Sequence, residues 1–154
     1  MKDTLLSRSL GKWKGTKKLW LAPGKKCRES DISVEVSDTA LGRCAVIKYE
    51  WSFAGEPQEG VLVLNTDYGK GSIQASWVDS FHVANGIMIL KGGFTEQDTI
   101  DLLGSYAAPP GPDWGWRIIL SLPKPNTIRI LSYNVTPGGD EQLAIEVLVS
   151  PAGK

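Results

Sequence analysis

The chain has 154 residues, in which 17 Lys and Arg balance 17 Asp and Glu. A net charge of zero argues against nucleic acid or an anionic membrane surface as the main partner, since both favour a basic excess. No apolar run approaches the ~20 residues of a membrane-spanning helix. Residues 1–10 are too short and polar for a signal peptide, so we expect a cytoplasmic protein with a single domain over residues 1–154.

The chain opens with two features. Residues 3–10 can form one short helical turn with three leucines on one side, which would cover one end of the fold. The segment Gly-Lys-Trp-Lys-Gly follows over residues 11–15. Gly11 and Gly15 permit a sharp bend or the close approach of another strand, and Trp13 can plug one end of a closed sheet. An ordinary first strand with a buried Trp and two turn glycines is the alternative.

The rest of the chain alternates turns with short segments of period two. Residues 31–37 and 43–53 show the clearest alternation of apolar and polar side chains, which is typical of half-buried strands. Asn85-Gly86 predicts a tight hairpin turn, and Gly92-Gly93 predicts the end of a strand. In all we expect strands over residues 12–21, 31–37, 43–53, 59–66, 72–79, 87–91, 99–106, 114–122, 127–136 and 142–149.

Sequential hairpins of this kind predict an all-β fold. They close most simply into an up-and-down antiparallel β-barrel of about ten strands, with the N-terminal helical turn as a plug, because a closed barrel leaves no sheet edge exposed. A two-sheet sandwich is the alternative. A strand of roughly 25 Å at ~3.3 Å per residue separates Cys27 from Cys44, so we expect two free thiols.

Two arginines stand out because their strands are otherwise Ile, Leu and Trp. In a barrel, Arg117 and Arg129 point either inward or outward. Inward, they could hold a carboxylate in a bidentate manner, with Glu50, Glu146 or a bound anion as the partner that a buried Arg needs. Outward, they belong to an ordinary solvated face. The residues leave both interpretations open.

The leading functional hypothesis is non-catalytic binding of a small hydrophobic or amphipathic molecule inside the barrel, with a carboxylate that has an apolar tail as one candidate. No nucleic acid, membrane span or cofactor is expected. A structural or interaction barrel, for example a homodimer through an exposed aromatic patch, is an alternative. The expected ligand-binding residues are Tyr49, Trp51, Trp77, Met88, Trp116, Arg117, Arg129 and Tyr133.

His82 is the only histidine in the chain. A lone His beside Phe81 is most often structural or exposed, and the alternative is a haem or metal ligand or an acid–base group. No zinc-type spacing and no nucleophile elbow are present. An isomerase or hydrolase that works at the barrel mouth is the enzymatic alternative, with His82, Asp79 and Tyr68 as the groups to test.

The Gly11–Gly15 opening resembles that of lipocalins, fatty-acid-binding proteins and nitrobindins, which are calycin-like barrels. The longer pattern is most similar to an uncharacterised bacterial family of this barrel type, through Tyr68, Trp77-Val78-Asp79 and Trp116-Arg117. The resemblance implies a calycin-like barrel with an interior ligand. Nitrobindin-like proteins bind haem through a histidine near the C-terminus, whereas His82 lies mid-chain, so we expect no haem. Fatty-acid-binding proteins place a helix-turn-helix lid between their first two strands. In this chain only residues 22–30 are available there, and they lack the amphipathic period of a helix.

Overall fold

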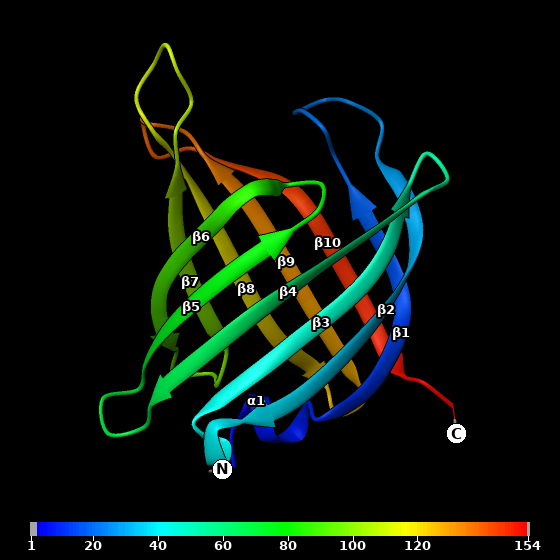
Figure 1. Ribbon diagram of the computed structural model, residues 1–154, viewed down its shortest axis with the longest axis vertical. Coiled ribbons are helices and arrows are strands. Elements are labelled where there is room, and N and C mark those ends of the chain that lie inside the picture. The colour runs from blue at the N-terminus through cyan, green and yellow to red at the C-terminus, as the bar shows by residue number, and fades with distance from the viewer. Residues whose placement is uncertain (1–2, 154) are drawn as a thin grey trace.

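The structure is a computed structural model in which residues 3–153 are described (Figure 1). These residues contain one short α-helix and ten strands. Each strand that the sequence predicts has a counterpart among the ten. The elements are α1 Leu5–Arg8, β1 Gly11–Leu19, β2 Arg28–Thr39, β3 Cys44–Phe53, β4 Glu56–Asp67, β5 Ser72–Asp79, β6 Val83–Phe94, β7 Ile100–Tyr106, β8 Trp114–Lys124, β9 Thr127–Val135 and β10 Glu141–Pro151, with a 3-10 turn at Ala40–Gly42.

The strands close into an antiparallel barrel. Each strand pairs with its neighbours in sequence, and β1 pairs with β10 from Trp13 opposite Pro151 to Leu19 opposite Ile145. This closure confirms the up-and-down barrel and excludes the sandwich. The helix α1 lies at the end where β1 begins, which is the lower end in Figure 1. We call the opposite end, where β1, β3 and β5 finish, the upper end.

The core fills the barrel because each strand buries every second side chain. In β8, for example, Trp116, Ile118 and Leu120 are buried, whereas the residues between them point outward. At the lower end, Leu5 and Leu6 of α1 complete the core. The sequence thus places one apolar face inside a closed sheet, as its period of two predicts.

Trp13 lies at the lower end, against α1. It is buried, and its Nε1 donates a hydrogen bond to the Ser9 carbonyl oxygen at 2.8 Å. The Ser9 hydroxyl in turn donates to the Leu5 carbonyl oxygen at 2.6 Å. Two residues further on, a Cβ at Gly15 would lie 2.0 Å from the Leu148 carbonyl oxygen. Glycine therefore lets β10 approach β1 closely where the barrel closes.

Two expected strand boundaries are wrong, since Asn85-Gly86 and Gly92-Gly93 both lie inside β6. The β5–β6 turn comes earlier, at residues 80–82, because the Asp79 carboxylate accepts backbone N–H groups there. A Cβ at Gly92 would lie 1.8 Å from the Asp101 carbonyl oxygen. That glycine therefore marks a close approach of β7 to β6, and the strand continues through it.

Cys27 and Cys44 are both free thiols, as the sequence predicts. Cys27 lies in the β1–β2 connection, and Cys44 opens β3, where its Sγ accepts a hydrogen bond from Asn65 Nδ2 at 3.3 Å. Within residues 3–153, no helix is long and apolar enough to cross a membrane.

Candidate functional site

The upper half of the barrel interior carries charged and polar side chains in an otherwise apolar core. Lys17 comes from β1, Tyr49 from β3 and Asp79 from the last position of β5. Lys17 points inward because it is in phase with Trp13 and Leu19 on the same strand. Its side chain is fully enclosed, with the residue only 2% exposed. A lysine that the strand period buries is rare and needs a physical account.

Within residues 3–153, Lys17 has an aromatic neighbour and no ionic partner. Its Nζ lies 3.1 Å from the centroid of the Trp51 ring, which is a cation–π contact. Among the described residues, no carboxylate oxygen lies within ion-pair distance of Nζ. Burial lowers the pKa of Lys17 to about 7, and the charge of Asp79 opposes that fall only in part. The amine therefore exchanges between charged and neutral forms near neutral pH.

Asp79 is fully buried, and hydrogen bonds occupy both its oxygens. Oδ2 accepts the Tyr49 hydroxyl at 2.5 Å, and Oδ1 accepts the backbone N–H groups of Phe81 and His82 at 2.7 and 2.8 Å. The Tyr49 oxygen also accepts Nε1–H of Trp77 at 2.7 Å. This network stabilises the buried carboxylate and holds the β5–β6 turn over the barrel.

Gly60 makes the contact between Tyr49 and Asp79 possible. It lies in β4, opposite Tyr49 on one side and Asp79 on the other. A Cβ there would lie 2.3 Å from the Tyr49 hydroxyl oxygen, so only a glycine lets this side chain cross β4. Burial, followed by the charge of Asp79, raises the pKa of Tyr49 well above its usual value. Tyr49 therefore remains a neutral hydrogen-bond donor.

His82 lies within a group of aromatic rings at the upper end. Its ring centroid is 6.0 Å from that of Trp51, 5.8 Å from Trp77, 5.7 Å from Trp116 and 4.8 Å from Phe81. Burial lowers the pKa of His82 to about 4, with Lys17 acting in the same direction and Asp79 against it. The imidazole is therefore neutral near pH 7.

Several nitrogens in this aromatic group are buried without a hydrogen-bond partner. They are Nε1 of Trp51, Nε1 of Trp116 and Nε2 of His82 within the part of the chain that the structure describes. Buried indole N–H groups usually find an acceptor, and the Asp79 carboxylate is already bound to other donors. The two indole N–H groups are therefore buried donors without an acceptor within residues 3–153, whereas the neutral His82 imidazole donates or accepts at Nε2 according to its tautomer.

A cavity of about 50 Å³ lies in the barrel interior beside this polar group. Since one water needs ~10–15 Å³ of such volume, the cavity has room for a few waters or one small organic group. Its wall is mostly Ile, Leu and Val, and its polar members are Lys17, Tyr49, Ser132 and the Trp77 indole. The cavity is thus apolar with one amine facing it.

The structure places five of the eight expected ligand-binding residues inside the barrel and three outside. Trp51, Trp77, Met88 and Trp116 are buried in the core, and Tyr49 is partly buried against it. The other three alternate with buried neighbours and lie on the outer face: Arg117, Arg129 and Tyr133.

The arginine anchor predicted for the interior is therefore corrected. Arg117 binds Asp101 through Nε at 2.9 Å and Nη2 at 2.5 Å, and it binds Glu141 through Nη1 at 2.7 Å. These hydrogen bonds raise its pKa. Arg129 Nε lies 3.6 Å from Glu146 Oε2. Both arginines are paired on the outer face, which is the solvated alternative that the sequence left open.

The three residues of the enzymatic alternative do not form an acid–base site. Tyr68 follows β4 in the lower turn, whereas Asp79 lies at the upper end of β5, seven residues beyond Ser72. At ~3.3 Å per residue these ends are more than 20 Å apart. His82 contacts Asp79 through its backbone N–H. Within residues 3–153, no three His, Cys, Asp or Glu side chains form a group that could hold a metal.

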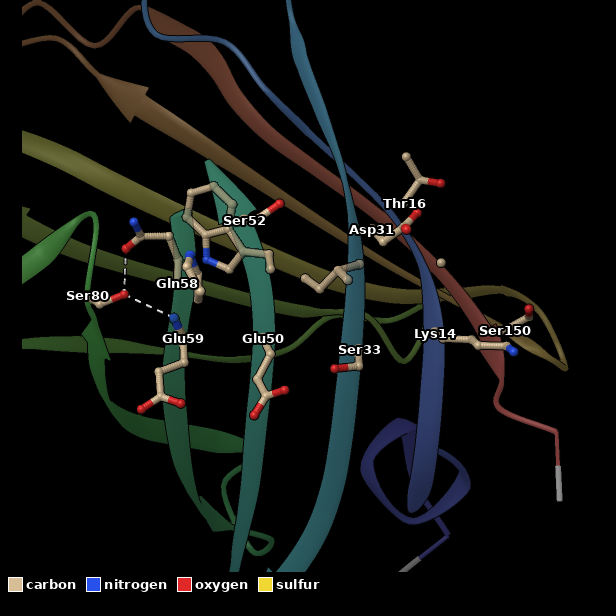
Figure 2. A pocket seen from close by; sticks show the side chains of 14 residues that line it. Lys14, Thr16, Asp31, Ser33, Glu50, Ser52, Gln58, Glu59, Ser80 and Ser150 are labelled. Atoms are coloured by element: carbon tan, nitrogen blue, oxygen red, sulfur yellow. Dashed lines mark hydrogen bonds between the residues drawn. The ribbon is translucent and has the colours of Figure 1, made fainter. Parts of the chain in front are cut away.

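An open groove of about 1100 Å³ runs across the outer face from β10 to β4 (Figure 2). Its polar lining includes Lys14, Asp31 and Glu50, whose charges are of mixed sign. The Ser80 hydroxyl donates to Gln58 Oε1 at 2.7 Å and accepts the Glu59 backbone N–H at 3.0 Å. These contacts tie the β5–β6 turn to β4. The groove is open to solvent, and its lysine, Lys14, is exposed, whereas Lys17 of the interior is buried.

The fold and the interior define a lipocalin-like closed barrel with a small apolar cavity at its centre. The chain belongs to a family described as "Protein of unknown function (DUF1579)", whose model matches residues 2–150. Whether the Gly11–Gly15 opening marks this family stays a prediction. Among curated proteins, the comparison finds no match.

Two solved structures have a similar fold. The crystal structure of Rv2717c from M. tuberculosis has a TM-score of 0.66 and 15% identity, over 96% of this chain and 95% of that chain. The S-type phycobiliprotein lyase CPES from Guillardia theta has a TM-score of 0.62 and 15% identity, over 97% of this chain and 90% of that chain. At this identity, the likeness concerns the fold alone.

Proposed function

We propose that this barrel binds a small, mainly apolar molecule in its interior without transforming it, and that the ligand carries one anionic group. The observation that carries the proposal is Lys17, a buried cation that faces an apolar cavity and lacks an anionic partner among residues 3–153. A carboxylate on the ligand would supply that partner, and the wall of Ile, Leu and Val would hold its tail.

The unpartnered nitrogens nearby support the same kind of ligand. Trp51 lies against the Lys17 amine, and Trp116 stacks on Trp77, which lines the cavity. Among the described residues, each of these two indoles has a buried Nε1–H without an acceptor. A carboxylate accepts several hydrogen bonds at once, whereas a hydrocarbon accepts none. Lys17 thus takes the role that the sequence assigned to Arg117 and Arg129. We also keep the cytoplasm as the proposed compartment, where the two free cysteines would stay reduced.

Titration of tryptophan fluorescence with butyrate and 1-butanol tests this proposal, because both chains are short enough for a small cavity. Loss of a charged hydrogen bond costs ~1.5–3 kcal/mol, so butyrate should bind roughly 10- to 150-fold more tightly than butanol. Lys17→Met should remove that preference. Lys14→Met is the matched control, since Lys14 is exposed on the outer face of the same strand.

Each outcome of this titration has a distinct meaning. Equal affinity for butyrate and butanol in the wild-type protein would overturn the anion anchor. A fluorescence response to neither probe, up to tens of millimolar, would overturn interior binding as a whole. A loss of preference in Lys14→Met as large as in Lys17→Met would place the acid on the outer face.

A further inference from the structure

Lys17 offers a second kind of chemistry that its neighbours on β1 do not. Its amine is enclosed by the barrel and lines the cavity, whereas Lys12 and Lys14 are exposed on the outer face. Among the described residues, no carboxylate oxygen lies within ion-pair distance of its Nζ, so no paired anion holds the amine in its protonated form. The lone pair of the neutral amine is then available to attack a carbonyl carbon. A buried, unpaired lysine amine is the type of group that forms Schiff bases with carbonyl compounds.

We propose that Lys17 condenses reversibly with a small apolar aldehyde in the barrel cavity to form a Schiff base. This inference rests on the proposed function, because the aldehyde occupies the same cavity as the acid. In the step, the neutral amine nitrogen forms a bond to the carbonyl carbon and gives up both its hydrogens. The carbonyl oxygen leaves with them as water, and a C=N bond remains. No electron is gained or lost overall.

Three features of the site favour this condensation. The cavity wall is apolar, so little water competes for the carbonyl carbon. The Trp51 ring, 3.1 Å from Nζ, can stabilise the positive charge of a protonated Schiff base as it does that of the ammonium. Phe81 and His82 pack over the upper interior against Trp51 and so shield the product.

The protonation state of Lys17 fits the proposed reaction, which needs a neutral amine. At pH 7 about half of a lysine with a pKa of about 7 is neutral. An ordinary exposed lysine, with a pKa of ~10.4, is neutral in only about one molecule in 2500. The titratable groups that affect Lys17 are Asp79 and His82, and Tyr49 lines the same cavity. Tyr49 and His82 are both neutral at pH 7.

Reductive trapping tests the proposal. The full chain is incubated with butanal and sodium cyanoborohydride at pH 7, and the butylated sites are located by tandem mass spectrometry. We expect Lys17 to be labelled at least tenfold faster than Lys12, Lys14 or Lys18, with the α-amino group assigned separately. Labelling of Lys17 should fall roughly 50-fold at pH 5, where its amine is protonated.

Competition separates this inference from the proposed function. Excess butyrate should suppress labelling of Lys17 and leave the outer lysines unchanged, and Lys17→Met should abolish the fast label. If butyrate binds but Lys17 is labelled no faster than Lys14, the Schiff base is refuted and interior binding stands. If butyrate does not bind and Lys17 is still labelled selectively, the amine chemistry stands and the acid ligand does not. Uniform labelling together with no butyrate binding refutes both.

Discussion

The two ends of the barrel use tryptophan in different ways. At the lower end, Trp13 is buried and its Nε1–H is bound by the Ser9 carbonyl oxygen at 2.8 Å. At the upper end, Trp51 and Trp116 are buried as well, yet among the described residues their Nε1–H groups have no acceptor. Satisfied packing stabilises a fold, whereas unsatisfied donors cost stability unless a ligand binds them. We therefore interpret Trp13 as a structural residue and the region around Trp51 and Trp116 as the candidate site.

The largest effect is expected at the lower end. Trp13→Ala should lower the free energy of unfolding by ~3–5 kcal/mol, because it empties a large part of the core. Trp13→Phe should cost less, since it keeps most of the volume and loses the hydrogen bond to Ser9. Denaturant unfolding measures both. A midpoint for Trp13→Ala within error of the wild type would show that this end does not hold the barrel together.

At the upper end we expect a substitution of Lys17 to raise the free energy of unfolding. The pKa of Lys17 falls from 10.5 to about 7 on folding, so the unfolded chain holds more protons than the folded one between these values. Stability therefore rises with pH from about 7 to 10.5, and the charged form is a cost below pH 7. Lys17→Met should add ~1–4 kcal/mol at pH 6 and little at pH 10. If Lys17→Met is less stable than the wild type at both pH values, the claim that the buried Lys17 charge lowers stability is wrong.

His82 gives the upper end a second pH dependence. Its pKa falls from 6.5 to about 4 on folding, so it too binds fewer protons in the folded state. Stability from this group is present above pH 6.5 and is lost as the pH falls toward 4, by up to roughly 3 kcal/mol. His82→Phe keeps a ring among Trp51 and Trp116 and cannot titrate. The free energy of unfolding of His82→Phe should fall less than that of the wild type between pH 6.5 and 4. If both proteins show the same pH dependence, the pKa of His82 is not lowered by burial.

The outer face provides the smallest expected effect. Arg117 is partly exposed and paired with Asp101 and Glu141, and such pairs contribute less than about 1 kcal/mol. Arg117→Gln should therefore change stability little and leave the affinity for butyrate unchanged. If Arg117→Gln loses as much butyrate binding as Lys17→Met, the carboxylate is bound by Arg117 and not by Lys17 alone.

The alternation of apolar residues was enough to predict the barrel. Ten strands, an N-terminal helical turn and the two free thiols all follow from period two, turn residues and spacing. Glycine was the main source of error, because a pair such as Gly92-Gly93 has the same letters in a turn and at a close approach of two strands. Only the partner strand β7 tells them apart.

The site was predicted less well, for a different physical reason. Arg117 and Lys17 both alternate with apolar residues, and period two alone does not say which of two alternating faces is inward. On β1, the positions of Trp13 and Leu19 put Lys17 on the apolar face, and this was the signal available in the sequence. Gly60 inside a strand was a second one. The contact it permits, from Tyr49 to Asp79, joins three strands and has no trace in local sequence.

The central claim is that Lys17 is a buried amine without an anionic partner in the part of the chain that the structure describes. Heteronuclear NMR of the lysine side chains, with Lys17→Met for assignment, gives its titration midpoint directly. We predict a midpoint near pH 7 for the free protein. Butyrate should move the midpoint upward, because a bound carboxylate stabilises the ammonium. A midpoint near 10.4, unchanged by butyrate, is the value of an ordinary exposed lysine and would contradict the account.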